Sequence, residues 1–240
     1  MCSLPLLRVK SLKEQVYDYL RGQMQKGKLS PGSVLDLEEI CGRLGVSKTP
    51  LREALLQLEM EDFVIIRPRR AVVVNSLTCQ EIKDIYGVIG ALEAQALASS
   101  FSGLRGPQVR TMMRLVGQMG QAITANDFDS YYDKNLRFHN IYLGSCGNDK
   151  LIRMVSTLKK RLYDFPRPSR FVKEWEVASI AEHRKLLTFI RQGKKWEAVR
   201  FIQNVHWSFA VQEKFIRLYY PRAGWTDQKM PSGPNQGRRP

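Results

Sequence analysis

The hydrophobic pattern of the first 75 residues predicts three helices followed by a β-hairpin. Apolar residues recur at the three- and four-residue steps of an amphipathic helix in three segments. These helices are expected after Ser11, over Leu35–Leu44 and after Ser47. Two β-branched runs, Phe63–Ile66 and Val72–Val74, flank the basic tip Arg67–Arg70 and are typical of a hairpin. Three helices and a hairpin make a winged helix-turn-helix.

The pattern changes after Asn75 to long helical periods. Thr78 and Glu81 have the spacing of a capping box, which marks a helix start. Helical patterns then cover residues 78–101, 107–125, 128–145, 149–164, 173–192 and 194–220. The predicted fold is therefore mostly α, with a short N-terminal extension (1–10), a winged helix-turn-helix (11–75), an all-α bundle of about six helices (76–220) and a disordered tail (221–240).

Composition narrows the functional classes. The chain has 240 residues, of which 43% are hydrophobic, so it can bury a core. We find no run of about 18 apolar residues and no signal-peptide pattern, and therefore expect a cytoplasmic protein that does not span a membrane. Four scattered cysteines without a Cys-x-x-Cys pair exclude a cysteine-based zinc ribbon and a disulfide framework.

The formal charge of +15 indicates an anionic partner, but it is not concentrated in the first domain. Residues 1–75 hold 12 Lys and Arg against 9 Asp and Glu, a net charge of +3, whereas residues 76–240 hold 26 against 14, a net charge of +12. In the second part, we expect basic runs such as Lys159–Arg161 and Lys194–Lys195 to form solvated helix surface. DNA readout would then depend on a few placed donors.

Polar and basic residues gather at the start of the third helix and at the hairpin tip. The start of such a helix enters the major groove, where long cationic side chains reach base edges and hydroxyls suit phosphate oxygens. The predicted DNA-binding residues are Ser47, Lys48, Thr49, Arg52, Arg67, Arg69 and Arg70. Any one of these basic residues could equally be a solvated turn residue, but the combined pattern favours double-stranded DNA as a partner.

The three histidines of the chain each fall on the inward face of a different predicted helix: His139, His183 and His206. Asn135 precedes His139 by four residues, so the two side chains share a face. Three imidazoles and an amide oxygen suit Zn²⁺, Ni²⁺, Fe²⁺ or Mn²⁺. Two alternatives remain: core histidines that bind no metal, or a metal-dependent enzyme. The sequence offers no clear general base beside the histidines, because Glu182 is expected to point about 100° away from His183.

Two sets of motifs resemble a known family. The stretch LGVSKTPLREAL (Leu44–Leu55), with SPG before it and RPRRAVVV after it, resembles the DNA-binding domain of GntR-family bacterial regulators. The stretches NLRFHNIYLGSCGNDKL (Asn135–Leu151) and AEHRKLLTFIRQGKKWEAV (Ala181–Val199), followed by His206, resemble the FCD ligand domain of the FadR-type branch. The order of the motifs matches over about residues 11–220.

This resemblance implies a homodimeric regulator, most often a repressor, whose FCD domain binds a divalent metal and senses a small carboxylate. The implied metal ligands are Asn135, His139, His183 and His206, with zinc as the first expectation. The family often has Arg where Ile89 stands, Gly where Ala71 stands and Arg where Lys48 stands. Because the Arg replaced by Ile89 would clamp a carboxylate, other arginines would have to bind the effector. We name Arg161, Arg167 and Arg170 for this role.

Overall fold

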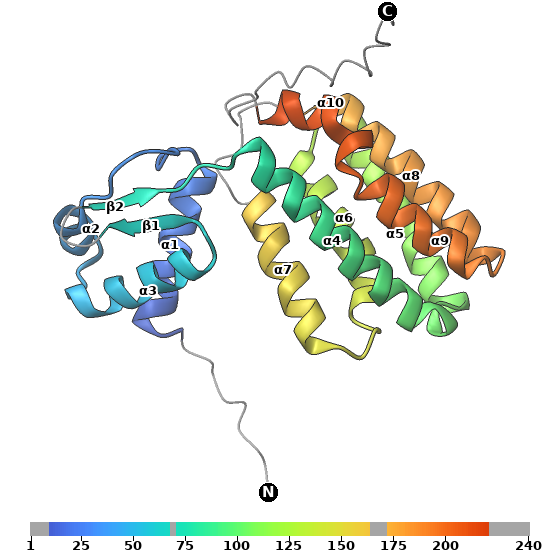
Figure 1. The fold of residues 1–240 in the computed structure, drawn as a ribbon, viewed down its shortest axis with the longest axis horizontal. Coiled ribbons are helices and arrows are strands. Elements are labelled where there is room, and N and C mark those ends of the chain that lie inside the picture. The colour runs from blue at the N-terminus through green and yellow to red at the C-terminus, as the bar shows by residue number, and fades with distance from the viewer. Residues whose placement is uncertain (1–9, 68–70, 164–171, 221–240) are drawn as a thin grey trace, which may run out of the picture.

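A computed structural model describes residues 10–67, 71–163 and 172–220. The first domain contains three helices and a two-stranded antiparallel sheet (Figure 1). Its elements are α1 (Leu12–Gln25), α2 (Leu37–Leu44), α3 (Lys48–Met60), β1 (Val64–Arg67) and β2 (Ala71–Val74). The predicted winged helix-turn-helix is thus confirmed. The tail, the first nine residues, and Arg69 and Arg70 of the predicted hairpin tip lie outside the described residues.

Local capping fixes where these helices begin and end. Ser11 and Glu14 form the capping box that starts α1, and the Asp36 side chain accepts a hydrogen bond from the Glu39 N–H at the start of α2. Gly45 ends α2 in the left-handed region with φ 64°, which glycine adopts without a Cβ clash. These signals place α2 and α3 in the sharp helix-turn-helix arrangement.

The hairpin joins this core through its register. Val64 pairs with Val74 and Ile66 with Val72, so that alternate side chains of the two strands face the helices. An isolated bridge between Val34 and Val73 adds the loop before α2 to the edge of the sheet. The sheet is therefore held on the helical core.

The second domain is all helical, and β2 leads through a short segment into its first helix (Figure 1). Thr78 and Glu81 form the expected capping box at this start. The helices are α4 (Cys79–Ser100), α5 (Gly106–Thr124), α6 (Phe128–Leu143), α7 (Asp149–Tyr163), α8 (Lys173–Arg191), α9 (Lys195–Phe201) and α10 (Phe209–Tyr219), with a short 3-10 turn at Phe101–Gly103. Helix α4 packs against α6, α7 and α9, and its buried stripe forms the centre of the bundle.

The single helix expected over residues 194–220 is wrong in one important respect. The chain forms α9, then a π-helical turn at Ile202–His206, and then α10, which Ser208 caps. A π turn carries an extra residue and so changes the direction of the side chains that follow it. Gly90 of α4 permits this segment to approach closely, because a Cβ at Gly90 would lie 3.0 Å from Cβ of Trp207.

The expectation that Lys159–Arg161 is solvated helix surface is also wrong. Lys159 and Arg161 are buried, whereas Lys160 between them is partly exposed. Arg161 lies over the Phe63 ring of the first domain, with its guanidinium 5.8 Å from the ring centroid. Helix α7 therefore faces both the bundle core and the DNA-binding domain. Within the described residues, no helix is both long and apolar enough to cross a membrane.

Candidate metal centre and DNA-binding surface

The three histidines meet in the core of the second domain. His139 comes from α6, His183 from α8 and His206 from the end of the π turn. One nitrogen from each ring lies within 4.8 Å of the other two, and Nε2 of His139 is 3.1 Å from Nε2 of His183. Two nitrogens bound to one ion at about 2.1 Å would lie about 3.0–3.4 Å apart, depending on the coordination geometry. The rings are thus spaced as ligands of a single metal ion.

Carboxylates orient two of the three imidazoles. Nδ1 of His139 lies 2.8 Å from Oε2 of Glu93, and Nδ1 of His206 lies 2.7 Å from Oε2 of Glu182. A carboxylate at Nδ1 fixes the tautomer and leaves Nε2 free to ligate, as in many metal sites. The tyrosine hydroxyl of Tyr142 also donates to Glu93 and lies 2.7 Å from Nδ1 of His139.

Glu93 is fully buried, and Lys159 provides its counter-charge. The Lys159 ammonium forms an ion pair with Oε1 of Glu93, while Oε2 faces His139 and Tyr142. Burial alone would raise the pKa of Glu93, but His139 and Lys159 hold it well below its usual range. Glu93 is therefore an anion that supports His139 from the side opposite the metal position.

Two of the histidines, His139 and His183, have pKa values below the usual range of an imidazole. Burial lowers the pKa of His139 to about 4, against the opposing effect of Glu93. Burial, with the neighbouring His206 and His139, also lowers the pKa of His183 well below its usual range. A neutral imidazole is the form that binds a metal. The site is thus prepared for an ion at neutral pH.

A buried amide oxygen tests whether a metal fits here. Oδ1 of Asn135 is buried without a hydrogen-bond partner among the described residues. Asn135 lies one helical turn before His139 and lines a cavity together with His206. An amide oxygen left without a hydrogen bond is costly to bury, and a metal ligand bond would satisfy it. The donor set therefore fits a divalent ion.

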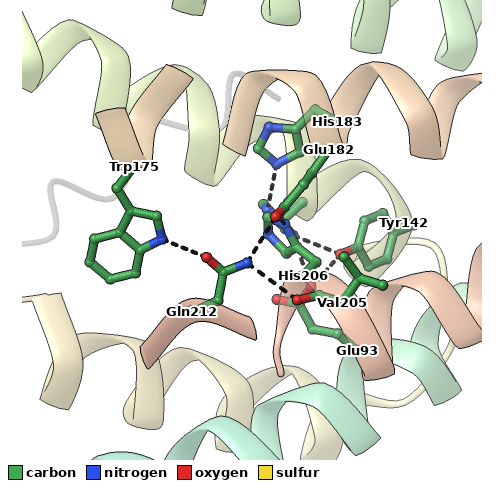
Figure 2. Close-up of polar contacts among 9 residues, drawn as sticks. Glu93, Tyr142, Trp175, Glu182, His183, Val205, His206 and Gln212 are labelled. Carbon is green, nitrogen blue, oxygen red and sulfur yellow. Dashed lines mark hydrogen bonds and ion pairs between the residues drawn. The ribbon is translucent and has the colours of Figure 1, made fainter. Parts of the chain in front are cut away.

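A hydrogen-bond chain links His206 to the last helix. Glu182 accepts from Nε2 of Gln212 at 2.8 Å, and Oε1 of Gln212 accepts from the indole N–H of Trp175 at 2.9 Å (Figure 2). Gln212 also donates to the Val205 carbonyl within the π turn. The chain holds the π turn, α8 and α10 together around the metal position.

The cavity beside Asn135 and His206 is small and aromatic. Its volume is about 60 Å³. The aromatic residues that line it include Tyr86, Tyr131, Tyr132, Tyr163, Trp175 and Trp207. Of the lining residues that the structure describes, none is Arg or Lys, and Glu176 is the carboxylate. The positive charge needed to hold an anion there would come from a metal.

Of the three predicted effector arginines, Arg161 is the one that the structure describes, and it does not line this cavity. Arg161 lies against Phe63, where burial lowers the pKa of its guanidinium to about 10, against the opposing effect of Glu81 and Asp62. This position does not favour a role as effector clamp. Arg167 and Arg170 lie outside the described residues.

Four of the predicted DNA-binding residues lie at the exposed start of α3. Ser47, Lys48, Thr49 and Arg52 are all exposed, and Arg67 is exposed at the end of β1. Ser47 occupies the N-cap position but makes no side-chain capping bond, so its hydroxyl is not used by the helix. Lys48 pairs with Glu38 of α2 at 2.5 Å across two well-exposed side chains.

Sequence reasoning missed the residues that support the histidines. Glu93 carried a signal, since it continues the apolar stripe of Tyr86 and Ile89 as a charged residue on an inward face. Glu182 was expected to point away from His183, which left no carboxylate beside the histidines. The conclusion that no carboxylate lies beside the histidines was wrong, because Glu182 contacts His206, which is remote in sequence. Both carboxylates bind Nδ1, so they orient the imidazoles.

Comparisons with known proteins agree with this architecture. Residues 12–74 match the family model described as bacterial regulatory proteins, gntR family, and residues 84–205 match the FCD domain. The gluconate operon transcriptional repressor of Bacillus subtilis (strain 168) is 26% identical over 216 residues, covering 88% of this chain and 85% of that protein. The matching families and relatives are transcriptional regulators and not enzymes.

Other matches are shorter or show the fold alone. The transcriptional repressor RspR of Escherichia coli (strain K12) is 25% identical over 130 residues, so the match spans 54% of this chain and 57% of RspR. The solved structure of E. coli McbR/YncC superposes with a TM-score of 0.64 at 23% identity, covering 89% of this chain and 99% of that chain. With the winged helix-turn-helix, the helical bundle and both family matches in place, the chain belongs to the GntR family of bacterial regulatory proteins and carries an FCD domain.

Proposed function

We propose that this protein is a transcriptional regulator, acting as a repressor, whose operator binding responds to a small carboxylate at a divalent-metal site. The observation that carries the metal claim is the convergence of three imidazoles, with Nδ1 of His139 and of His206 each held by a carboxylate. His139, His183 and His206 would hold the ion, with the Asn135 oxygen as a fourth ligand. Zinc is the first expectation, with nickel, iron and manganese as the other candidates.

The ligand class follows from charge. The ion would supply a positive charge, and its imidazole and amide ligands would themselves carry no negative charge to offset it. The cavity beside it has no Arg or Lys among its described lining residues. The aromatic walls and the Trp175–Gln212 hydrogen bond would then orient the remainder of a small acid. We therefore expect a compact carboxylate rather than a long-chain effector.

The DNA side of the proposal uses the exposed start of α3. As a homodimer the protein would present two such helices to half-sites about 34 Å apart. An effector that favours one arrangement of the dimer would change how well both helices match the operator. Repression is favoured because the Bacillus subtilis relative and RspR are both named repressors. A regulator of this kind would act in the cytoplasm, where operator DNA lies.

A combined DNA and ligand experiment tests this function. A DNA duplex selected from a random library with the wild-type protein would serve as operator, and its binding would be measured with metal added, with metal chelated, and with a panel of small carboxylates. We expect one or more acids to change the operator affinity only when metal is present. An effect of the acids that is equal in the His183→Ala variant would contradict the role of the metal site. Failure to select any duplex would contradict DNA binding itself.

A further inference from the structure

A second cavity lies between the two domains, apart from the aromatic cavity beside His206. Its volume is about 460 Å³, within the range of small-molecule sites, which often lie at domain interfaces. Helix α1 of the DNA-binding domain contributes one wall, and α6 and α7 of the FCD domain contribute the others. The polar residues that line it are Arg21, Tyr132, Asn140, Ser156, Lys159 and Lys160.

All charged side chains that line this interdomain cavity, among the described residues, are positive. Arg21, Lys159 and Lys160 line it, and no carboxylate does so among the described residues. Ser156 lies three and four residues before the two lysines, so all three share one face of α7. Arg21 is positioned within its own domain, with its guanidinium 5.4 Å from the centroid of the Tyr17 ring. Lys159 is already paired with Glu93, so Arg21 and Lys160, which come from two different domains, are the cations that an anion in this cavity would contact.

We propose that the interdomain cavity binds a small organic anion with two or more negative charges. Arg21 offers a planar fork of donors for a carboxylate or phosphate group, and Lys160 offers a point charge. The hydroxyl of Ser156 and the amide of Asn140 add neutral donors at the same wall. Phosphate esters and polycarboxylates share this oxyanion chemistry. The site does not depend on the metal centre for its charge.

The position of this cavity gives the anion a consequence for DNA binding. An anion that contacts Arg21 and Lys160 at once would join the recognition domain to the effector domain and restrict their relative orientation. Lys159 also forms the ion pair with Glu93, which in turn contacts His139. Tyr132 lines both cavities. The second anion would therefore act next to the metal centre without occupying it.

Calorimetric titration of the full-length protein tests the proposal, with inorganic pyrophosphate and tricarballylate as probes at constant ionic strength. The informative variants are Arg21→Gln and Lys160→Gln, which leave the metal ligands intact. The matched control is Lys150→Gln, an exposed cation on the same helix α7. We expect saturable binding of at least one probe to wild type, weakened about tenfold or more in the first two variants and unchanged in the control. Binding of pyrophosphate alone would indicate a phosphate ester, and binding of tricarballylate alone a polycarboxylate.

Three results would overturn the proposal. In the first, neither probe binds to the wild-type protein. In the second, all three variants weaken binding equally, which would indicate a diffuse charge effect. In the third, binding is unchanged in Arg21→Gln and Lys160→Gln but lost in His183→Ala, which would place the anion on the metal centre and leave the proposed function intact. Metal content should be unchanged in the Arg21 and Lys160 variants, which shows that the FCD domain remains folded.

Discussion

The DNA-binding face and the histidine cluster are two polar sites built in opposite ways. Ser47, Lys48 and Arg52 extend from an exposed helix start, where few contacts fix their side chains. His139 and His183 are each 1% exposed, and His139 is held by Glu93. A surface site can lose a side chain without loss of fold, whereas a buried polar network is costly when one member is removed. We therefore expect substitutions on the DNA-binding face to weaken DNA binding without loss of stability. Substitutions in the histidine cluster should reduce stability and metal binding together.

The largest expected effect comes from the buried Glu93. Glu93→Ala leaves the Lys159 ammonium buried without its carboxylate, which should lower the free energy of unfolding by about 3–5 kcal/mol. Chemical denaturation measures this change in the free energy of unfolding. Glu213→Ala is the control, because Glu213 pairs with Arg217 on the surface of α10 and its loss should cost less than about 1 kcal/mol. Equal costs for the two variants would contradict the contrast between buried and exposed sites.

Arg52→Ala should weaken DNA binding and leave the stability of the protein unchanged. Loss of a base or phosphate contact would weaken binding to a selected duplex by about 1–3 kcal/mol. The melting temperature should stay close to that of wild type, because the Arg52 side chain is exposed. Lys150→Ala, an exposed cation of the second domain, is the control for a general charge effect. Unchanged affinity in Arg52→Ala would remove this residue from the DNA-binding surface.

A glycine pair on α4 tests how the π turn is held. Gly90→Ala places a Cβ 3.0 Å from Cβ of Trp207 and should destabilise the protein by about 1–3 kcal/mol while weakening metal binding through His206. Gly87→Ala adds a methyl group in open space on the same helix and should stabilise it by about 0.5–1 kcal/mol. Thermal unfolding and metal titration measure both. If Gly90→Ala binds metal as wild type does, the close packing of α4 does not position His206.

The smallest expected effect compares two helix N-caps. The Thr78 hydroxyl caps α4, so Thr78→Ala should cost about 1 kcal/mol of stability. Ser47 makes no side-chain capping bond, so Ser47→Ala should change stability less while it weakens duplex binding. Denaturation and duplex titration of both variants measure this. A stability loss in Ser47→Ala as large as that in Thr78→Ala would show that Ser47 serves the helix rather than DNA.

Much of the fold could be predicted from the sequence because its signals are local. The capping box at Thr78 and the glycine end of α2 at Gly45 depend on residues a few positions apart. The inward faces of His139 and His183 also followed from helical spacing. The break after α9 could not be predicted in this way, because it depends on the approach of Trp207 to Gly90, more than a hundred residues earlier.

The charged residues that surround the histidines could not be predicted from local sequence patterns for the same reason. Lys159 belongs to a basic run that has the composition of a solvated surface, yet Glu93 on another helix draws it into the core. Glu182 orients His206 rather than its neighbour His183. Long-range pairing of charges decides these positions, and a single sequence holds no direct record of it.

The most direct test of the central claim is the metal content of the purified protein. Wild type and His183→Ala would be loaded with zinc, dialysed and measured by elemental analysis, with circular dichroism to verify that the variant is folded. The account predicts about one equivalent of metal per chain in wild type and a large loss in His183→Ala, because the three histidine nitrogens converge on one position. No bound metal in wild type after loading with zinc, nickel, iron or manganese, or equal amounts in the folded variant, would contradict it.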